Sequence, residues 1–191
     1  MSLHLSPSQI GALSGARVFA SARLHARRWR VADAPALHAV YGDPEGARFV
    51  GDGTPITPAQ CDDWIRVTAD AYLQRGYGMF ALDEIHSGDL VGFCGIVHPG
   101  GQPEPEIKYS LLRSHWRRGL ATELVPALLG YGARSLGLSR VIATVDLDHA
   151  VSRRVLAGAG MTHVTTRVDP DGAKVCVYAW LAPDGAARHE T

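Results

Sequence analysis

The stretch from Glu106 to Leu136, EIKYSLLRSHWRRGLATELVPALLGYGARSL, predicts a strand, a short basic turn and then a helix. Amides at the start of a helix have no partner inside it and carry the positive end of its dipole, so they attract phosphate. Gly119 lets an anion approach the backbone closely, and the adjacent Arg117 and Arg118 suit phosphate oxygens. We expect either a pyrophosphate-binding turn or a plain strand-to-helix connection with two solvated arginines.

Two other phosphate-binding motifs do not fit this turn. The Gly-Lys-Ser/Thr ending of a P-loop is missing. A dinucleotide-binding fingerprint requires further glycines, and only Gly119 is present. The turn alone therefore leaves the ligand open.

The 191 residues predict one domain that can bury a sizeable core. We place an N-terminal extension or loosely docked arm at residues 1–20, the domain at 21–182 and a C-terminal tail at 183–191. The formal net charge of +0 argues against a general nucleic-acid or membrane-surface binder.

The cysteines and the apolar runs bear on the compartment. Cys61, Cys94 and Cys176 lie far apart without metal-type spacing, so we expect no metal site. Cys94 and Cys176 sit in apolar strand-like runs, so we expect buried free thiols. The N-terminus lacks the apolar stretch of a signal peptide, and no run approaches transmembrane length. These features predict a cytoplasmic protein.

The remaining patterns predict an α+β chain with one covered sheet. Strands are expected at residues 23–31, 78–83, 90–98, from 106, and at 140–145, 161–168 and 173–181. Helices are expected from Asp33, from Thr57-Pro58 to Gly76, from the basic turn to Gly137, and from Asp148 or His149 to Gly160. The turn Asp169-Pro170-Asp171-Gly172 joins the last two strands, and Pro126 is expected to kink the central helix.

Four segments in order carry a family resemblance: residues 22–33 (ARLHARRWRVAD), 106–109 (EIKY), 116–123 (WRRGLATE) and 149–161 (HAVSRRVLAGAGM). Together they resemble the GNAT superfamily of acyl-CoA N-acyltransferases, closest to its RimJ/RimL-like branch, over residues 22–181. The resemblance implies an α/β/α sandwich-like GNAT fold. Its sheet is mixed and mostly antiparallel, with about seven strands, flanking helices and splayed central strands.

The resemblance also implies the ligand and its contacts. The acyl donor is acetyl-CoA, a cosubstrate, and no metal takes part. Residues implied to contact CoA are Leu111 and Leu112 for the pantetheine arm, the turn residues Arg117, Arg118, Gly119, Leu120, Ala121 and Thr122 for the pyrophosphate, and His149 and Ser152 beyond them.

Two positions depart from the family pattern. The family asparagine is His149 here, which is bulkier and titrates near neutrality. The tyrosine that acts as general acid in many members falls at Leu156, so that role is vacant there. Ser152 matches the serine that is the usual candidate in this branch.

Transfer to an amine also needs a base, and Glu106 is our candidate, acting through a water. Strand alternation puts Glu106, Lys108 and Ser110 on one face, so the alternative is a solvated Glu/Lys pair. Ser152 either protonates the leaving thiolate or only caps its helix. Five flanking residues either take part in the site, the histidines in catalysis and the arginines at the CoA phosphates, or are simply exposed to solvent: His98, His115, Arg113, Arg153 and Arg154.

The sequence thus predicts an acetyl-CoA-dependent N-acetyltransferase that transfers acetyl directly to a primary amine, either a protein N-terminal α-amine or a small amine. The alternative is a non-catalytic acyl-CoA-binding or regulatory domain with the same fold. No nucleic-acid or membrane partner is expected. The acceptor and the oligomeric state stay open, with a homodimer among the assemblies considered.

Overall fold

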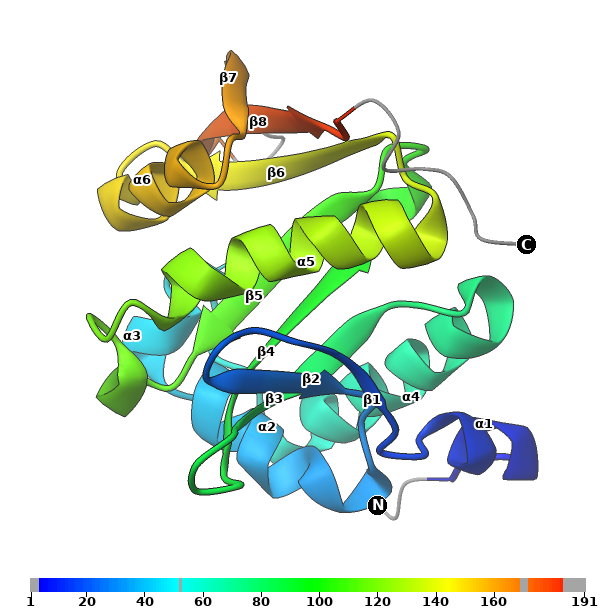
Figure 1. The fold of residues 1–191 in the computed structure, drawn as a ribbon. Helices are drawn as coiled ribbons and strands as arrows, with labels where there is room; N and C mark the ends of the chain where they lie inside the picture. Colours follow the sequence, from blue (N-terminus) through cyan, green and yellow to red (C-terminus); the bar gives the residue numbers. More distant parts are fainter. Residues whose placement is uncertain (1–3, 52, 169–171, 184–191) are drawn as a thin grey trace. The chain divides into compact units, whose positions relative to one another are not determined.

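A computed structural model describes residues 4–51, 53–168 and 172–183. Its strands are β1 (Arg17–Ala20), β2 (Leu24–Arg27), β3 (Met79–Glu84), β4 (Leu90–Val97), β5 (Glu106–Leu111), β6 (Arg140–Asp146), β7 (Thr162–Val168) and β8 (Lys174–Leu181). Its α-helices are α1 (Pro7–Ala12), α2 (Ala34–Tyr41), α3 (Pro44–Ala47), α4 (Pro58–Arg75), α5 (Leu120–Leu136) and α6 (Ala150–Gly158). The strands form one mixed, mostly antiparallel sheet in the order β1-β2-β3-β4-β5-β6-β8-β7 (Figure 1).

The chain divides into two compact units, which we describe separately. The first comprises residues 1–95 and 109–120, and the second comprises residues 96–108 and 121–191. Strands β4 and β5 each contribute residues to both units.

The first unit is built on the antiparallel strands β1 to β4. Helix α4 begins at a capping box in which Thr57 and Gln60 bond each other's backbone amides, and it ends at Gly76 with a left-handed φ of 78°. Its Tyr72 ring stacks on Phe80 of β3 with 5.8 Å between centroids. The predicted bounds of this helix are therefore confirmed.

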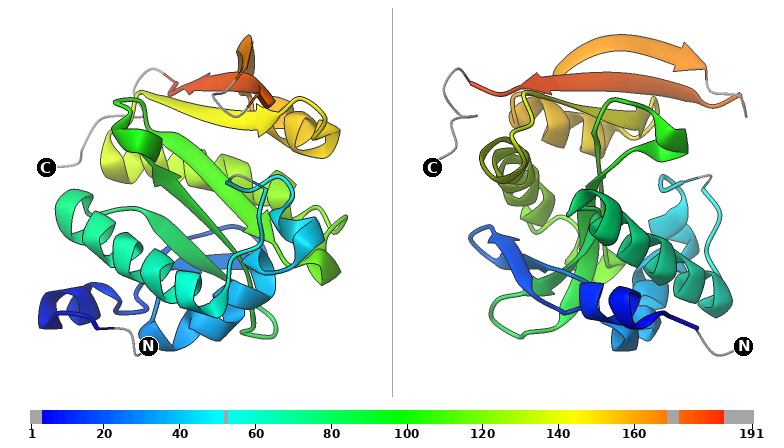
Figure 2. Two further views of the ribbon diagram at one scale, coloured as in Figure 1. Left: turned by 180° about the vertical axis from the view of Figure 1, so that it is seen from behind. Right: turned by 90° about the vertical axis from the view of Figure 1, so that its right-hand side faces the viewer.

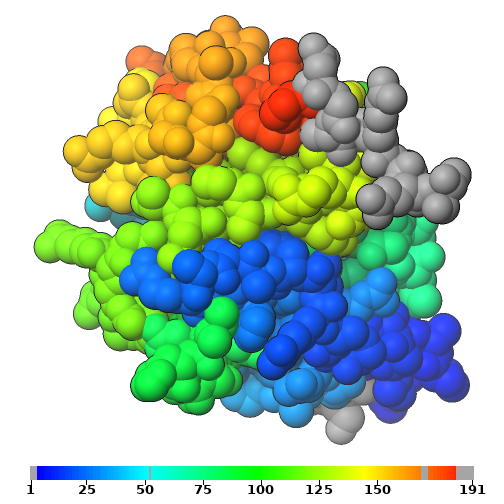
Figure 3. Space-filling model, viewed as in Figure 1, coloured from blue at the N-terminus to red at the C-terminus, as the bar shows by residue number. Residues whose placement is uncertain are grey.

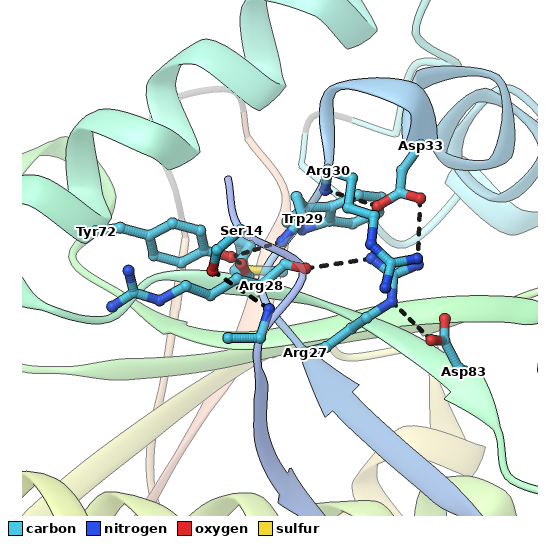
Figure 4. Close-up of polar contacts among 10 residues, drawn as sticks. Ser14, Arg27, Arg28, Trp29, Arg30, Asp33, Tyr72 and Asp83 are labelled. Atoms are coloured by element: carbon cyan, nitrogen blue, oxygen red, sulfur yellow. Dashed lines mark hydrogen bonds and ion pairs between the residues drawn. The ribbon is translucent and has the colours of Figure 1, made fainter. Parts of the chain in front are cut away.

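A buried ion network joins β2, β3 and the residue before α2 in the first unit (Figure 4). Arg27 is only 5% exposed, and its guanidinium lies 2.6 Å from both Asp83 Oδ2 and Asp33 Oδ2. Burial alone would lower the pKa of Arg27, but the hydrogen bonds and charges of Asp33 and Asp83 together raise it. The charge is therefore retained and compensated inside the unit.

The second unit carries β6, β8 and β7 as an antiparallel set, with α5 and α6 on the same side of β6 and β8 (Figures 1 and 2). Helix α5 lies close to the strands, because a Cβ at Gly132 would stand 3.0 Å from Ile96 Cδ1. The helix is continuous across Pro126, where the sequence predicts a kink. Gly137, with a φ of 67°, follows its end as predicted.

Several expectations need correction. The sheet has eight strands instead of about seven, because Arg17–Ala20 forms β1. This four-residue strand has a weak pattern of its own and forms through pairing with β2. The first predicted strand, 23–31, shortens to Leu24–Arg27. Within the expected N-terminal extension, α1 is tied to α4 by the Gln9 amide, which donates to Asp70 at 2.8 Å. The turn residues 169–171 and tail residues 184–191 lie outside the described residues.

Candidate active site

The segment between β5 and α5 is an exposed turn with an unusual backbone. Arg117 has a φ of 59°, and it is the one non-glycine residue with positive φ in the described part of the chain. Gly119 follows at φ 75°, and Leu120 is buried as the first residue of α5. Figure 3 shows the green segment before α5 at the surface. The first amides of α5 have no partner inside the helix, so this turn presents N–H groups to an incoming anion.

The space above Gly119 is compatible with a close anion. A Cβ built on Gly119 meets only Arg23 Nη2, at 3.5 Å. The glycine is needed for its backbone conformation, and its missing side chain leaves the amides accessible. The residues present therefore fit a pyrophosphate at Arg117 to Thr122.

The two arginines of the turn differ in their surroundings. Arg118 Nη2 lies 2.6 Å from Glu84 Oε1, and His115 Nε2 stands 4.0 Å from the other oxygen of the same carboxylate. Arg117 is exposed and has no ion-pair partner among the residues that the structure describes. Arg118 is thus held by a protein carboxylate, whereas Arg117 projects its charge into solvent.

The end of β5 is hydrogen-bonded to β4 and to the Trp116 side chain. Leu112 donates its N–H to the Val91 carbonyl at 2.8 Å, and Trp116 Nε1 donates to the Leu111 carbonyl at 2.8 Å. Because strand amides alternate in direction, the Leu111 N–H points away from β4. Of the two leucines predicted to pair with pantetheine, Leu111 therefore offers a suitably directed amide, and the Leu112 amide is already used.

Glu106 lies where β5 and β6 stop pairing. The parallel ladder has one register pair among the described residues, Glu106 with Ile142, preceded by an Ile142 N–H to Pro105 carbonyl bond of 2.9 Å. In a continued ladder the Thr144 N–H would reach the Ile107 carbonyl. It instead donates to Glu106 Oε1 at 3.1 Å. The carboxylate thus replaces a backbone carbonyl at the point where the β5–β6 ladder ends, which we call the fork.

The Glu106 side chain is only 3% exposed, so the alternative of a solvated Glu/Lys pair is wrong for the glutamate. Lys108 forms an ion pair with Oε1, and Gln102 Nε2 donates to Oε2 at 3.1 Å. These neighbours compensate the buried negative charge. His98, in the loop before β5, contacts Gln102: its Nδ1 lies 2.9 Å from the Gln102 carbonyl oxygen.

The remaining predicted residues lie at the start of α6. His149 is the residue before the helix, and its side chain makes no capping hydrogen bond. Ser152, at the third helical position, is 9% exposed. Arg153 turns inward and donates to the Leu147 carbonyl at 2.9 Å, and a hydrogen bond with Tyr178 raises its pKa. Arg153 thus has hydrogen-bond partners within the fold, whereas Arg154 is exposed, and a contact of either with the CoA phosphates stays a prediction.

The structure divides the predicted residues between the units. Leu111, Leu112 and the turn up to Leu120 belong to the first unit, and Glu106, His149 and Ser152 belong to the second. Sequence reasoning missed Gln102 and Thr144, because neither their loop nor their strand carries a pattern that marks them. None of the described helices combines the length and the apolar character that a bilayer span requires.

Comparisons with known proteins place this arrangement among acetyltransferases. The model of the acetyltransferase (GNAT) domain family matches residues 23–162. The uncharacterized N-acetyltransferase p20 of Bacillus licheniformis is 33% identical over 138 residues, which cover 70% of this chain and 76% of p20. The uncharacterized N-acetyltransferase YoaA of Bacillus subtilis is 30% identical over 140 residues, which cover 72% of this chain and 78% of YoaA.

The solved structures extend the likeness to the fold. RimL, a ribosomal L7/L12 alpha-N-protein acetyltransferase in complex with coenzyme A, has a TM-score of 0.76 at 18% identity. The match covers 90% of this chain and 99% of RimL. At that identity the likeness shows a shared fold.

Proposed function

This chain belongs to the GNAT acetyltransferase family, and on that premise we propose that it transfers acetyl from acetyl-CoA to a primary amine, the α-amine of a protein N-terminus in the first place. The chain is an N-acetyltransferase; the donor contacts, the acceptor and the residue roles are the proposal. The observation that carries it is the buried Glu106 carboxylate at the fork between β5 and β6.

In the proposed complex the chain's own groups bind and orient the donor. The amides from Arg117 to Thr122 hold the pyrophosphate, and the Leu111 N–H pairs with the pantetheine arm. Bound acetyl-CoA supplies an acyl thioester. His149 and Ser152 contact the CoA arm from the start of α6.

The transfer step balances as follows. The lone pair of the neutral amine forms the C–N bond, and the C–S bond breaks with its electrons going to sulfur. The amine loses one proton toward Glu106, through a water, and the thiolate gains one from the Ser152 hydroxyl, which recovers a proton from solvent. The carboxylate thus acts on the amine, and the serine acts on the leaving group.

The preference for an α-amine follows from proton energetics. At pH 7 a protein α-amine, with a pKa of about 8, requires roughly 1.4 kcal/mol to lose its proton, whereas lysine, with a pKa of about 10.4, requires roughly 4.6 kcal/mol. A carboxylate base is a weak one, so the acceptor that requires less assistance is favoured. The likeness to RimL, whose name specifies α-N-protein acetylation, points in the same direction.

The test is release of free thiol from acetyl-CoA with a panel of N-terminal peptides, amino acids, polyamines and aminoglycosides. Titration calorimetry with acetyl-CoA is run in parallel. We expect binding, and turnover with N-terminal peptides at higher kcat/KM than with lysine side chains. Turnover confined to another amine class would overturn the acceptor assignment. Binding without turnover across the panel would favour the acyl-CoA-binding alternative.

A further inference from the structure

Thr144 on β6 carries a buried hydroxyl that the fold leaves without a partner. Its Oγ1 is inaccessible to solvent and has no hydrogen bond among the residues that the structure describes. A buried polar group without a partner costs stability, and most buried hydroxyls are paired. The backbone N–H of the same residue is used, since it donates to Glu106. The hydroxyl therefore calls for an explanation that the fold itself does not supply.

The register shows where this hydroxyl lies. Glu106 is the ladder partner of Ile142, and Thr144 follows two residues later, so Thr144 and Glu106 share one face of the strands. On the other side of β6 the register partner of Thr144 is Val177, which belongs to β8 and offers no polar side-chain atom. Ile142, Val177 and Ala179 form an apolar cluster on this face. The hydroxyl thus belongs to the residue whose backbone N–H is bonded to the Glu106 carboxylate at the fork.

The Glu106 carboxylate already has three hydrogen-bond or ion-pair partners among the described residues. Oε1 accepts the Thr144 N–H and faces Lys108, and Oε2 accepts from Gln102. An incoming amine brings two or three N–H donors, all of which need acceptors when the site is closed to water. A threonine hydroxyl has two acceptor lone pairs and can rotate its proton away. Glu106 keeps one free acceptor position for the water of the proposed proton transfer, and the threonine hydroxyl supplies a further acceptor for the amine.

We propose that entry of the acceptor amine beside Glu106 uncovers the Thr144 hydroxyl, which then accepts a hydrogen bond from the amine nitrogen and so orients its lone pair toward the acyl carbon. This assignment rests on the proposed function. It makes Thr144 a substrate-positioning residue beside the Glu106 base, and it explains why an unpaired hydroxyl is kept in an apolar strand. A stability cost retained at a working site is a common trade-off.

The valine variant of Thr144 tests the assignment, because valine keeps the shape and removes only the hydroxyl. We expect Thr144→Val to lower kcat/KM for the amine by about 3- to 10-fold, the range of a lost hydrogen bond between neutral groups. The Kd for acetyl-CoA is expected to change by less than about two-fold. The melting temperature should stay equal or rise, because an unsatisfied buried hydroxyl has been removed. Thr144→Ser should restore most of the activity.

A matched control comes from Thr162 on β7, whose hydroxyl donates to the Ala179 carbonyl at 3.3 Å. Thr162→Val should lower the melting temperature and leave kcat/KM unchanged, the reverse of the Thr144 pattern.

Three outcomes overturn the inference, and only the third of them overturns the proposed function as well. Unchanged amine kcat/KM in Thr144→Val, with an active native chain, overturns the inference alone. A lowered melting temperature with no rescue by Thr144→Ser shows a structural hydroxyl and also overturns it. No turnover by the native chain with any amine overturns the proposed function and this inference together.

Discussion

Thr144 donates its backbone N–H to Glu106 Oε1 over 3.1 Å, at a point where a regular parallel ladder would use a backbone carbonyl. One carboxylate therefore ends the β5–β6 ladder and, in our proposal, also serves as the base. These two duties respond differently to substitution. A neutral amide can still accept the Thr144 N–H, but it cannot take up a proton from an amine.

Arg117 stores backbone strain in the turn before α5. Its φ of 59° costs roughly 1–2 kcal/mol for a residue with a Cβ. Arg117→Ala keeps this cost and Arg117→Gly removes it, at some expense in unfolded-chain entropy. We expect the glycine variant to be more stable than the alanine variant by about 1 kcal/mol in urea unfolding, and both to bind acetyl-CoA more weakly than the native chain. Equal stability of the two variants would contradict the strained backbone.

The pair of Glu84 and Arg118 offers a second test of the turn. The Arg118 side chain is 43% exposed and that of Glu84 14%, so the pair is worth about 0.2–1 kcal/mol. Bound phosphate must compete with Glu84 for this guanidinium. We expect Glu84→Gln to tighten acetyl-CoA binding by about two- to five-fold in calorimetry, and the effect to disappear in an Arg118→Ala background. An equal gain in that background would show that Arg118 does not contact the phosphates.

Much of the fold was predictable wherever a single residue type decides a boundary. Thr57 and Gly76 delimit α4: the Thr57 side chain accepts a hydrogen bond from a free amide at the helix start, and the Gly76 backbone adopts a left-handed φ at its end. The basic turn was predictable for the same reason, since Gly119 precedes a helix start. β1 was not, because it depends on pairing with β2 and has only four residues.

Less of the candidate site than of the fold could be predicted from the sequence. Strand alternation predicted that Glu106 and Lys108 share a face, and the structure pairs them. The contact between Glu106 and Thr144 spans 38 positions and depends on where the β5–β6 pairing ends, which no local pattern encodes. The positive φ of Arg117 was equally hidden, since arginine has no preference for that conformation.

The buried Arg27 is predicted to be sensitive to loss of either partner. Asp83→Ala leaves a buried cation with half of its compensation, and breaking a buried pair costs about 3–5 kcal/mol. We expect a decrease of that size in the free energy of unfolding, measured in urea. The exposed pair of Arg66 and Asp63 is the control, and Asp63→Ala should cost less than about 1 kcal/mol. Similar losses in both variants would contradict the network.

Two buried thiols predict a loss of stability in alkali. Burial, with a smaller effect of Asp62, raises the pKa of Cys61 from 9.0 to about 11, and burial raises the pKa of Cys94 as well. Above pH 9 the unfolded chain loses these protons while the folded chain keeps them, so stability falls as pH rises. The loss is about 1.4 kcal/mol per thiol between pH 8 and pH 10.

Urea unfolding at pH 8 and pH 10 measures this effect, and a variant with both Cys61 and Cys94 replaced by alanine is the control. The native chain should lose about 3 kcal/mol more than the variant over this interval. An identical pH dependence of the two proteins would show that the thiols ionise equally in both states. Because all three cysteines are buried, the native chain should also react slowly with thiol reagents, which keeps the thiol-release assay clean.

The most direct test of the account compares Glu106→Gln with the native chain, by acetyl-CoA turnover and by acetyl-CoA titration. Glutamine can still accept the Thr144 N–H, so the variant should fold, whereas Glu106→Ala leaves buried donors unpaired and should lose about 1–3 kcal/mol of stability. We predict that Glu106→Gln lowers kcat/KM for the amine by at least about 100-fold. Its Kd for acetyl-CoA should stay within about two-fold of the native value. A folded Glu106→Gln variant with native turnover would contradict the role of Glu106 as the base.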